Sequence, residues 1–256
     1  MKKKIISLLF LVLISTFISS STFAFSTQFP SSLQLSSSTQ LPNSIQFPNN
    51  MISNFNIPNS YFLNINKKDA EEIYKETLSA LRYQMYIELN WNNLKIEQDM
   101  DLYSSNDKAL GKPGDILITV FDSDNHDINA ICLGSLTTHA AFVDSDPSKV
   151  LEVLPGGVQN GENDWRTRYK KVLVLRPNLD KKTVTSAIEY GHTKIGTPFN
   201  FNFFDKTTTN KFYCSEFVWR CFMNSGVDLD GNGGKAVFPY DFIQSSRVSI
   251  VYKQGE

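Results

Sequence analysis

The chain has 256 residues, of which 41% are hydrophobic and 12% aromatic, and its formal net charge is −1. This composition fits a globular protein with a sizeable core. So small a charge gives no reason to expect nucleic acid or anionic lipid as a partner. Cys132, Cys214 and Cys221 include no CxxC pair, which excludes a scaffold held by many disulfides and leaves at least one thiol free.

Residues 1–24 have the pattern of a secretory signal peptide. Three lysines precede an apolar stretch over 5–18, and the small residues that lead up to Ala24 fit a signal peptidase site with cleavage after Ala24. The apolar stretch is shorter than the ~20 residues of a transmembrane helix, so an uncleaved anchor is the weaker alternative. We therefore expect a secreted or cell-envelope protein without an integral membrane segment, and its mature net charge would be −4.

The next two segments differ sharply in composition. Residues 25–60 are rich in Ser, Gln, Asn, Pro and Phe, with the loose repeat TQFP, TQLP and IQFP, which predicts a flexible linker. This linker is either a spacer or a means of association with a cell wall. Within residues 61–110, apolar side chains recur at helical spacing and predict a long amphipathic helix with a break near Asn90.

Residues 111–256 read as the main domain. Strands are expected at 115–120, 138–144, 149–154, 169–177 and 246–253, and helices at 181–196 and 214–226. The strands come in runs instead of alternating with helices. This order predicts an α+β fold in which an antiparallel sheet packs against helices.

His139 begins an expected strand whose other residues are apolar, whereas His126 and His192 fit surface positions. If residues 144–147 form a four-residue hairpin connection, His139 directly faces Glu152 on the next strand, at about 5 Å between Cβ atoms. Glu152 is the only acid in the apolar run VLEVL, where an unpaired charge is costly. An exposed glutamate on an edge strand is the alternative.

Cys214 stands at the expected start of a helix. There the helix dipole and the free N–H groups favour a thiolate, and the N–H groups of Cys214 and Ser215 could bind an oxyanion. In a Cys–His–Glu set, Glu152 would fix the imidazole tautomer and His139 would deprotonate the thiol, which then attacks an acyl carbon. The alternative is that Cys214 is only a small apolar core residue, as expected for Cys221.

Several stretches together resemble the circularly permuted papain-like amidases of the YiiX/YaeF type, within the NlpC-related superfamily of papain-fold hydrolases. The matching stretches, from about Gly111 to the C-terminus, are GDILITV, THAAFV, LEVLPGGV, VLRP, IGTPFNFNF, FYCSEFVW and GVDLD. The resemblance implies a permuted papain-like fold with the order His139, Glu152, Cys214 for base, third polar residue and nucleophile. It also implies that Tyr213, the aromatic before the cysteine, shapes the substrate cleft.

No cofactor or metal is expected. Asp228, Asp230 and Asn232 alternate as in a calcium loop, but its twelfth position is Pro239 instead of a bidentate glutamate, so a turn is the better interpretation. We hypothesise a secreted cysteine hydrolase that cleaves amide bonds, with a peptide or peptidoglycan fragment as substrate. The alternatives are an acyltransferase or lipid-directed thiol hydrolase on the same fold, and a non-catalytic module that binds the wall or a partner.

Overall fold

The computed structural model describes two single residues, Glu76 and Ile87, and the ranges 90–97, 109–119, 139–200 and 205–255. The expected signal peptide and linker lie outside these residues. In the expected helical segment, Glu76 and Ile87 have helical conformation, and a turn at Asn90 leads into the short 3-10 helix η3 (Trp91–Asn93). Ile87 and Trp91 belong to the hydrophobic core, so these two residues pack on the main domain.

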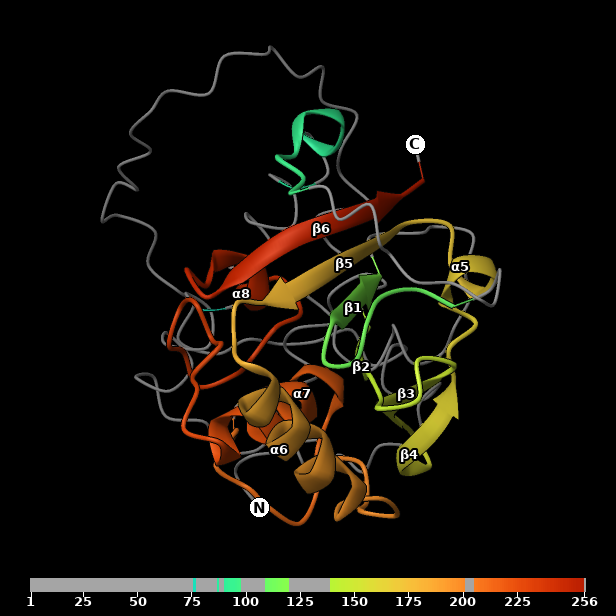
Figure 1. Cartoon of the computed structure of the whole chain (residues 1–256). Coiled ribbons are helices and arrows are strands. Elements are labelled where there is room, and N and C mark those ends of the chain that lie inside the picture. Colours follow the sequence, from blue (N-terminus) through green and yellow to red (C-terminus); the bar gives the residue numbers. More distant parts are fainter. Residues whose placement is uncertain are drawn as a thin grey trace, which may run out of the picture.

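One sheet of six strands forms the centre of the molecule, and every neighbouring pair is antiparallel (Figure 1). Its spatial order is β4-β3-β2-β1-β5-β6. The strands are β1 (Ile116–Thr119), β2 (Ala140–Val143), β3 (Lys149–Leu154), β4 (Gly157–Glu162), β5 (Val172–Pro177) and β6 (Val248–Gln254). This sheet with its helices confirms the α+β expectation.

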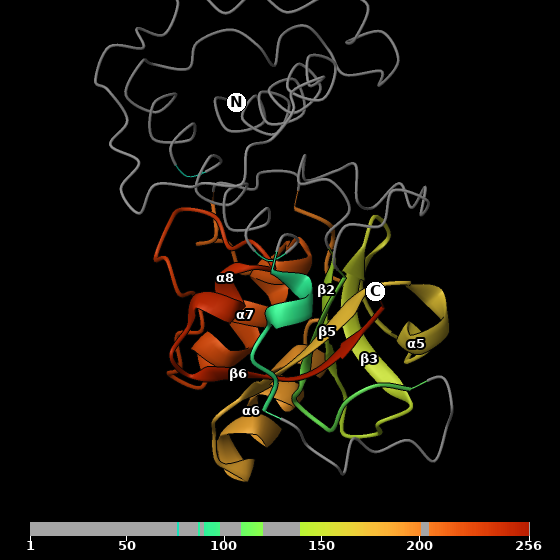
Figure 2. The same ribbon diagram turned by 90° about the horizontal axis from the view of Figure 1, so that it is seen from above.

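Helices cover both faces of this sheet. They are α5 (Trp165–Arg168), α6 (Lys181–His192), α7 (Cys214–Asn224) and α8 (Asp241–Gln244). Figure 2 shows α7 and α5 on opposite sides of the strands. Asp180 caps α6, since its carboxylate accepts a hydrogen bond from the Thr183 N–H at 2.8 Å. Among the described residues, no helix has the length and apolarity needed to cross a membrane.

The alternation of side chains along the strands divides the buried residues into two cores. On one face, Phe142 of β2 packs against Phe217 and Phe222 of α7. The residues of β2 with the opposite orientation, such as Ala141, join the second core together with Trp165 of α5. His139 and Glu152 lie on this second face as well. His139 is two residues from Ala141 and Glu152 is two residues from Val150, and both of these belong to the second core.

The hairpin of β2 and β3 corrects the predicted register. His139 was expected directly opposite Glu152, but the residue opposite Glu152 is Ala141, which shifts the ladder by two residues. Side chains on a strand change face with every residue, so a shift of two keeps His139 and Glu152 on the same face. Their side chains then meet diagonally across the ladder, within the reach that such pairs allow.

Turn chemistry explains the difference in register. The expected connection, 144–147, is replaced by one over 145–148, because the Asp144 N–H donates to the Lys149 carbonyl and continues the ladder. Asp146 closes the turn, since its carboxylate accepts a hydrogen bond from the Ser148 N–H at 2.9 Å. An aspartate that binds the backbone two residues further on is a strong local turn signal.

Three elements were not predicted: β4, α5 and α8. The sequence of β4, GVQNGE, contains two glycines and has the polar composition of a loop. It forms a strand because Leu154 pairs with Gly157 across a tight connection at Pro155 and Gly156. The helices α5 and α8 have only four residues each, too few to show a helical period.

Candidate active site

Cys214 is the first residue of α7, and its side chain is buried. The preceding residue, Tyr213, has an extended backbone with φ −97° and ψ 172°, so the chain enters the helix at Cys214 through a sharp change of direction. The thiol is a hydrogen-bond partner of the His139 imidazole and accepts from the backbone N–H groups of Ala140 and Ser215. The helix start and the beginning of β2 therefore meet at this sulfur.

These contacts set the charge of the thiol. Burial alone would raise the pKa of Cys214, but the hydrogen bond and positive charge of His139, together with two backbone N–H groups, lower it overall. Burial would likewise lower the pKa of His139. The neighbouring Tyr169 and the hydrogen bonds to Cys214 and Glu152 oppose this and hold that pKa well above its ordinary value. Both shifts favour a thiolate beside an imidazolium.

The imidazole of His139 is held from several directions. Its backbone N–H donates to the Thr119 hydroxyl at 2.8 Å, and its carbonyl accepts from the Thr119 N–H at 3.0 Å. Its Nε2 lies 3.0 Å from Oε2 of Glu152, which leaves Nδ1 for the sulfur. The ring stacks on Trp165, with 5.5 Å between centroids and 19° between planes. These contacts fix the position and the tilt of the ring.

Glu152 is buried, with a side chain that is 1% exposed, and every donor around it supports an ionised carboxylate. Besides His139, Gln159 donates to its Oε1 at 3.3 Å, and Nη1 of Arg168 lies 3.4 Å from each carboxylate oxygen. Burial would raise the pKa of Glu152. The hydrogen bond and charge of His139, the charge of Arg168 and the amide of Gln159 outweigh it and lower that pKa.

Together, the three side chains can support nucleophilic chemistry on an acyl group. The structure brings His139, Glu152 and Cys214 together, and their order along the contacts is carboxylate, imidazole, sulfur. A thiolate at a helix N-terminus beside an imidazolium is a strong nucleophile with a proton donor at hand. The roles of base, orienter and nucleophile remain a prediction, which the geometry makes specific.

The two cleft candidates have inward-facing side chains. Tyr213 is fully buried, and its hydroxyl accepts a hydrogen bond from the Val237 N–H at 2.9 Å. The Ser215 hydroxyl donates to the Val237 carbonyl at 2.6 Å. The Tyr213 side chain can thus affect a cleft only indirectly, through the backbone at Val237. For Ser215, it is the backbone N–H that faces the sulfur.

A second buried glutamate closes the turn before the cysteine. Glu216 accepts hydrogen bonds from the Asn200 amide at 2.9 Å, the Thr208 hydroxyl at 2.9 Å and the Tyr213 N–H at 3.2 Å. Burial raises its pKa to about 7, against the opposing effect of these hydrogen bonds. Because the third residue of α7 binds the backbone of the residue that precedes the helix, Glu216 completes a capping arrangement at the site.

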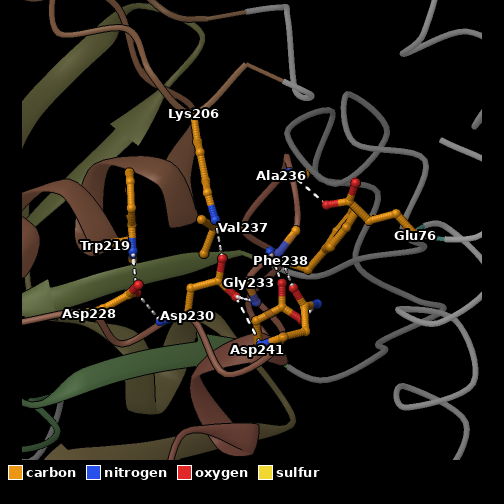
Figure 3. A network of polar contacts seen from close by, with 12 residues as sticks. Glu76, Lys206, Trp219, Asp228, Asp230, Gly233, Ala236, Val237, Phe238 and Asp241 are labelled. Atoms are coloured by element: carbon orange, nitrogen blue, oxygen red, sulfur yellow. Dashed lines mark hydrogen bonds and ion pairs between the residues drawn. The ribbon is translucent and has the colours of Figure 1, made fainter. Parts of the chain in front are cut away.

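The stretch on either side of Val237 is bound by a network of acidic side chains, drawn in Figure 3. Glu76 accepts from the Ala236 N–H at 2.7 Å, and Asp241 accepts from the Phe238 N–H at 2.7 Å. Burial raises the pKa of Asp241 to about 8. Backbone amides in this region are thus bound by carboxylates that come from separate parts of the chain.

The loop that was tested as a calcium site has other partners. Asp228 accepts from the Trp219 indole at 2.8 Å, and Asp230 forms an ion pair with Lys206 (Figure 3). Asp230 also accepts from the N–H groups of Asn232 and Gly233, as in a tight turn. Within the described ranges, no cluster of three or more His, Cys, Asp or Glu is suited to hold a metal ion.

The other histidines and cysteines lie away from this site or outside the described residues. His192 at the end of α6 binds the buried Asp144, with 2.8 Å between Nε2 and Oδ1, so it links the helix to the β2–β3 turn. Cys221 is a free, fully buried thiol, and burial holds its pKa well above the ordinary value. His126 and Cys132 lie outside the described residues.

Sequence reasoning missed three residues that contact the imidazole or the carboxylate. Gln159 lies on β4, while Trp165 and Arg168 lie on α5. For Trp165 and Arg168 the available signal is the cluster WRTRY, directly after two polar residues, Asn163 and Asp164, whereas nothing in the sequence points to Gln159. Aromatic and arginine side chains in a short segment between strands are typical of a region that packs on a polar site.

Residues 112–233 match the model of the family described as permuted papain-like amidase enzymes, YaeF/YiiX, family C92. This match confirms the resemblance. His139, Glu152 and Cys214 all lie within the matched segment. At a coarse level, the match supports a cysteine-type amidase or peptidase.

Two individual proteins are also similar to the chain. The uncharacterized protein YycO of Bacillus subtilis (strain 168) is 29% identical over 112 residues, which are 42% of this chain and 46% of YycO. The chain thus spans less than half the length of this curated relative. The crystal structure of the metalloprotein YiiX from Escherichia coli O157:H7 is 18% identical, with a TM-score of 0.45, and the match covers 57% of this chain and 98% of YiiX.

Proposed function

Starting from the match of residues 112–233 to permuted papain-like amidases, we propose that this protein is a cysteine hydrolase that cleaves amide bonds. The observation that carries the proposal is the contact chain from the Glu152 carboxylate through the His139 imidazole to the Cys214 sulfur. The substrate would be a peptide, and we favour cell-wall peptides. The protein would act outside the cytoplasm, either secreted or in the cell envelope.

The reaction would follow the acyl-enzyme route. The Cys214 thiolate attacks the carbonyl carbon of the amide, and backbone N–H groups at the start of α7 stabilise the oxygen as it becomes negative. As the C–N bond breaks, the imidazolium of His139 gives its proton to the departing amine. His139 then takes a proton from water, whose oxygen attacks the thioester. A carboxylic acid leaves, and the thiolate and imidazolium are regenerated.

Glu152 would orient and polarise the imidazole throughout this cycle. With Nε2 held at 3.0 Å from the carboxylate, Nδ1 stays directed to the sulfur, and the imidazolium is stabilised when it forms. The low pKa of Glu152, caused by His139 and Arg168 against burial, keeps this carboxylate charged. The Glu152–His139 pair is therefore suited to keep the Nε2 proton on the ring while Nδ1 gives up and takes back its proton in each turnover.

Features of the chain support the location outside the cytoplasm. The lysine-rich start, the apolar stretch and the small residues before residue 25 fit export. The linker at 25–60 would separate the catalytic body from its point of release or attachment. Exported proteins usually pair their cysteines in structural disulfides. A free thiol in an exported protein with only three cysteines is therefore better explained by catalysis.

The test compares Cys214→Ala with Cys221→Ala, which removes a buried thiol from the same helix. Purified peptidoglycan fragments and lipid esters are offered in parallel to the exported chain and to both variants. We expect amide cleavage by the parent chain and by Cys221→Ala, and a loss of about 10³-fold or more in Cys214→Ala. Equal turnover by Cys214→Ala would refute the proposal.

The nature of the acyl group separates the remaining alternatives. Trapping the intermediate and weighing the peptide that carries Cys214 should reveal a peptidyl adduct. A fatty adduct would instead favour an acyltransferase or lipid-directed hydrolase with the same nucleophile. The absence of any adduct and of any turnover, in a folded protein, would favour a non-catalytic binding module.

A further inference from the structure

The short helix α5 covers the imidazole–carboxylate pair on the face of the sheet opposite α7 (Figure 2). Trp165, at its start, stacks on the His139 ring, and Tyr169, directly after its end, packs on Trp165 with 4.8 Å between ring centroids. Arg168, at its last position, reaches the Glu152 carboxylate. One turn of helix thus contributes contacts to both polar partners of the sulfur.

The Arg168 guanidinium is itself held in place. Its Nε lies 2.7 Å and its Nη2 2.5 Å from the Asp164 carboxylate, and Nη2 also donates to the Glu162 carbonyl at 3.2 Å. Its Nη1 is 3.4 Å from both oxygens of Glu152, so this contact is mainly electrostatic. Asp164 and Glu162 therefore fix the planar fork of donors, and the fork presents a positive charge to the buried carboxylate.

Glu152 needs such a charge. A carboxylate with 1% exposure loses most of its hydration, and a single histidine partner that releases its proton during a reaction cannot supply a constant charge. Arg168 is permanently protonated, and with 25% side-chain exposure it keeps part of its own hydration. A constant cation beside both oxygens of Glu152 keeps the acid ionised through both protonation states of His139.

We propose that Arg168 is a positioning residue of this site: it holds the Glu152 carboxylate ionised and directed at His139, and so sets the pH range in which Cys214 is a thiolate. The inference rests on the proposed function insofar as that thiolate is the nucleophile. Among the described residues, the charged and titratable groups at the pair come from several elements: Cys214 from α7, His139 before β2, Glu152 from β3, and Asp164, Arg168 and Tyr169 around α5.

The sign of the expected effect is simple. Removing a cation destabilises nearby negative charge and stabilises nearby positive charge, so it raises the pKa of every group close to it. Thiolate formation at Cys214 should therefore move to higher pH in Arg168→Gln, by about half to one pH unit. A purely structural role would lower the amount of active protein without moving this midpoint.

Alkylation by iodoacetamide measures this without a substrate. Trypsin cleaves after Lys211 and Arg220, so Cys214 and Cys221 fall in different peptides, 212–220 and 221–235, and mass spectrometry reads each thiol separately. The rate of alkylation in peptide 212–220 is followed against pH for the parent chain and its variants. Arg168→Lys keeps the charge and should keep the midpoint.

Arg166→Gln is the matched control. It removes the same charge from the same helix, but Arg166 donates to the Tyr252 hydroxyl at 3.1 Å instead of the Glu152 carboxylate, so the alkylation midpoint should stay unchanged. Arg168→Met, which retains an unbranched apolar stem beside Tyr169, replaces Arg168→Gln if the latter does not fold. A midpoint that rises in neither neutral variant overturns the inference, as does an equal rise in Arg166→Gln.

The same measurement separates failure of this inference from failure of the proposed function. If Cys214 in the parent chain is alkylated only at the pH of an ordinary thiol, near 8.5, it is not an activated nucleophile and both ideas fall. If the parent thiol is activated and Arg168→Gln shares its midpoint, the nucleophile stands and the role of Arg168 falls. An activated parent thiol with an upward shift specific to Arg168 supports both.

Discussion

Two buried glutamates lie near the candidate nucleophile, and different kinds of donor surround them. Glu152 faces an imidazole, a guanidinium and one amide, and its pKa is lowered in spite of burial. Glu216 is held by an amide, a hydroxyl and a backbone N–H, all neutral, and burial raises its pKa to about 7. Although both glutamates are buried, their pKa values are therefore shifted in opposite directions.

The comparison shows what a buried acid needs in order to stay charged. Neutral donors satisfy the oxygens of Glu216 and hold the turn before Cys214, and this requires no fixed charge. Cations around Glu152 compensate the lost hydration of a full negative charge, which the site requires if an imidazolium is to form beside it. The two acids thus serve geometry and electrostatics separately, although each is close to the sulfur.

Glu152→Gln should produce the largest effect. The amide retains the shape of the side chain but has no charge and can stabilise the wrong imidazole tautomer, so kcat/KM should fall by about 10²–10⁴-fold with the fold intact. Amide hydrolysis and a thermal melt measure both properties. Glu162→Gln, an exposed glutamate at the end of β4, is the control and should change little. Retention of full activity by Glu152→Gln would show that the site does not require a charged acid at this position.

Glu216→Gln should change the pH dependence of stability. The pKa of Glu216 is about 7 in the folded chain against 4.5 for an ordinary glutamate, so between these values the native state binds more protons than the unfolded state. The free energy of unfolding should therefore fall as pH rises through this window, by at most about 3 kcal/mol from this residue. Glu152, with its lowered pKa, contributes in the opposite sense, and its stabilisation is lost as pH falls.

Denaturant unfolding of the parent chain and Glu216→Gln at about pH 5 and about pH 8 measures this slope. The variant should lose part of the decline that the parent shows. Glu189→Gln, an exposed acid on α6, controls for the general effect of removing a negative charge. A decline of equal size in parent and variant would show that Glu216 is ionised throughout, as Glu152 is.

Gln159→Met should have the smallest effect of the three. It removes one neutral hydrogen bond of 3.3 Å from Glu152 and leaves both cationic partners in place. We expect kcat/KM to fall by about two- to tenfold, the usual value of one such bond. The measurement is the same hydrolysis assay. A loss as large as that of Glu152→Gln would mean that neutral donors matter as much as cations at this carboxylate.

Much of the sheet could be predicted from the sequence because its strands are apolar runs of ordinary length. The contact between His139 and Glu152 was also predicted, although the register was wrong by two residues. The predicted contact was still correct, because the face on which a side chain lies depends only on whether the register is shifted by an odd or an even number of residues. The turn that decides the shift depends on Asp146, a local hydrogen-bonding preference that hydrophobic pattern does not report.

The contacts of α5 could not be predicted in the same way. Four residues give no helical period, and the preceding strand β4 has the composition of a loop, so the sequence does not show that the chain returns to the site. Arg168 meets Glu152 only because β4 pairs with β3 and the chain then turns back over that sheet face. Contacts of this kind depend on topology: the cluster WRTRY marks candidate side chains, but it does not tell which residues they meet.

The backbone beside the nucleophile places a practical limit on redesign. Three consecutive amides, at Ala236, Val237 and Phe238, each donate to a different side chain: the distant Glu76 and Tyr213, and Asp241 three residues further on. Inserting or deleting one residue here would misalign all three bonds at once. Single substitutions of side chains in this stretch should therefore disturb the site less than any change of its length.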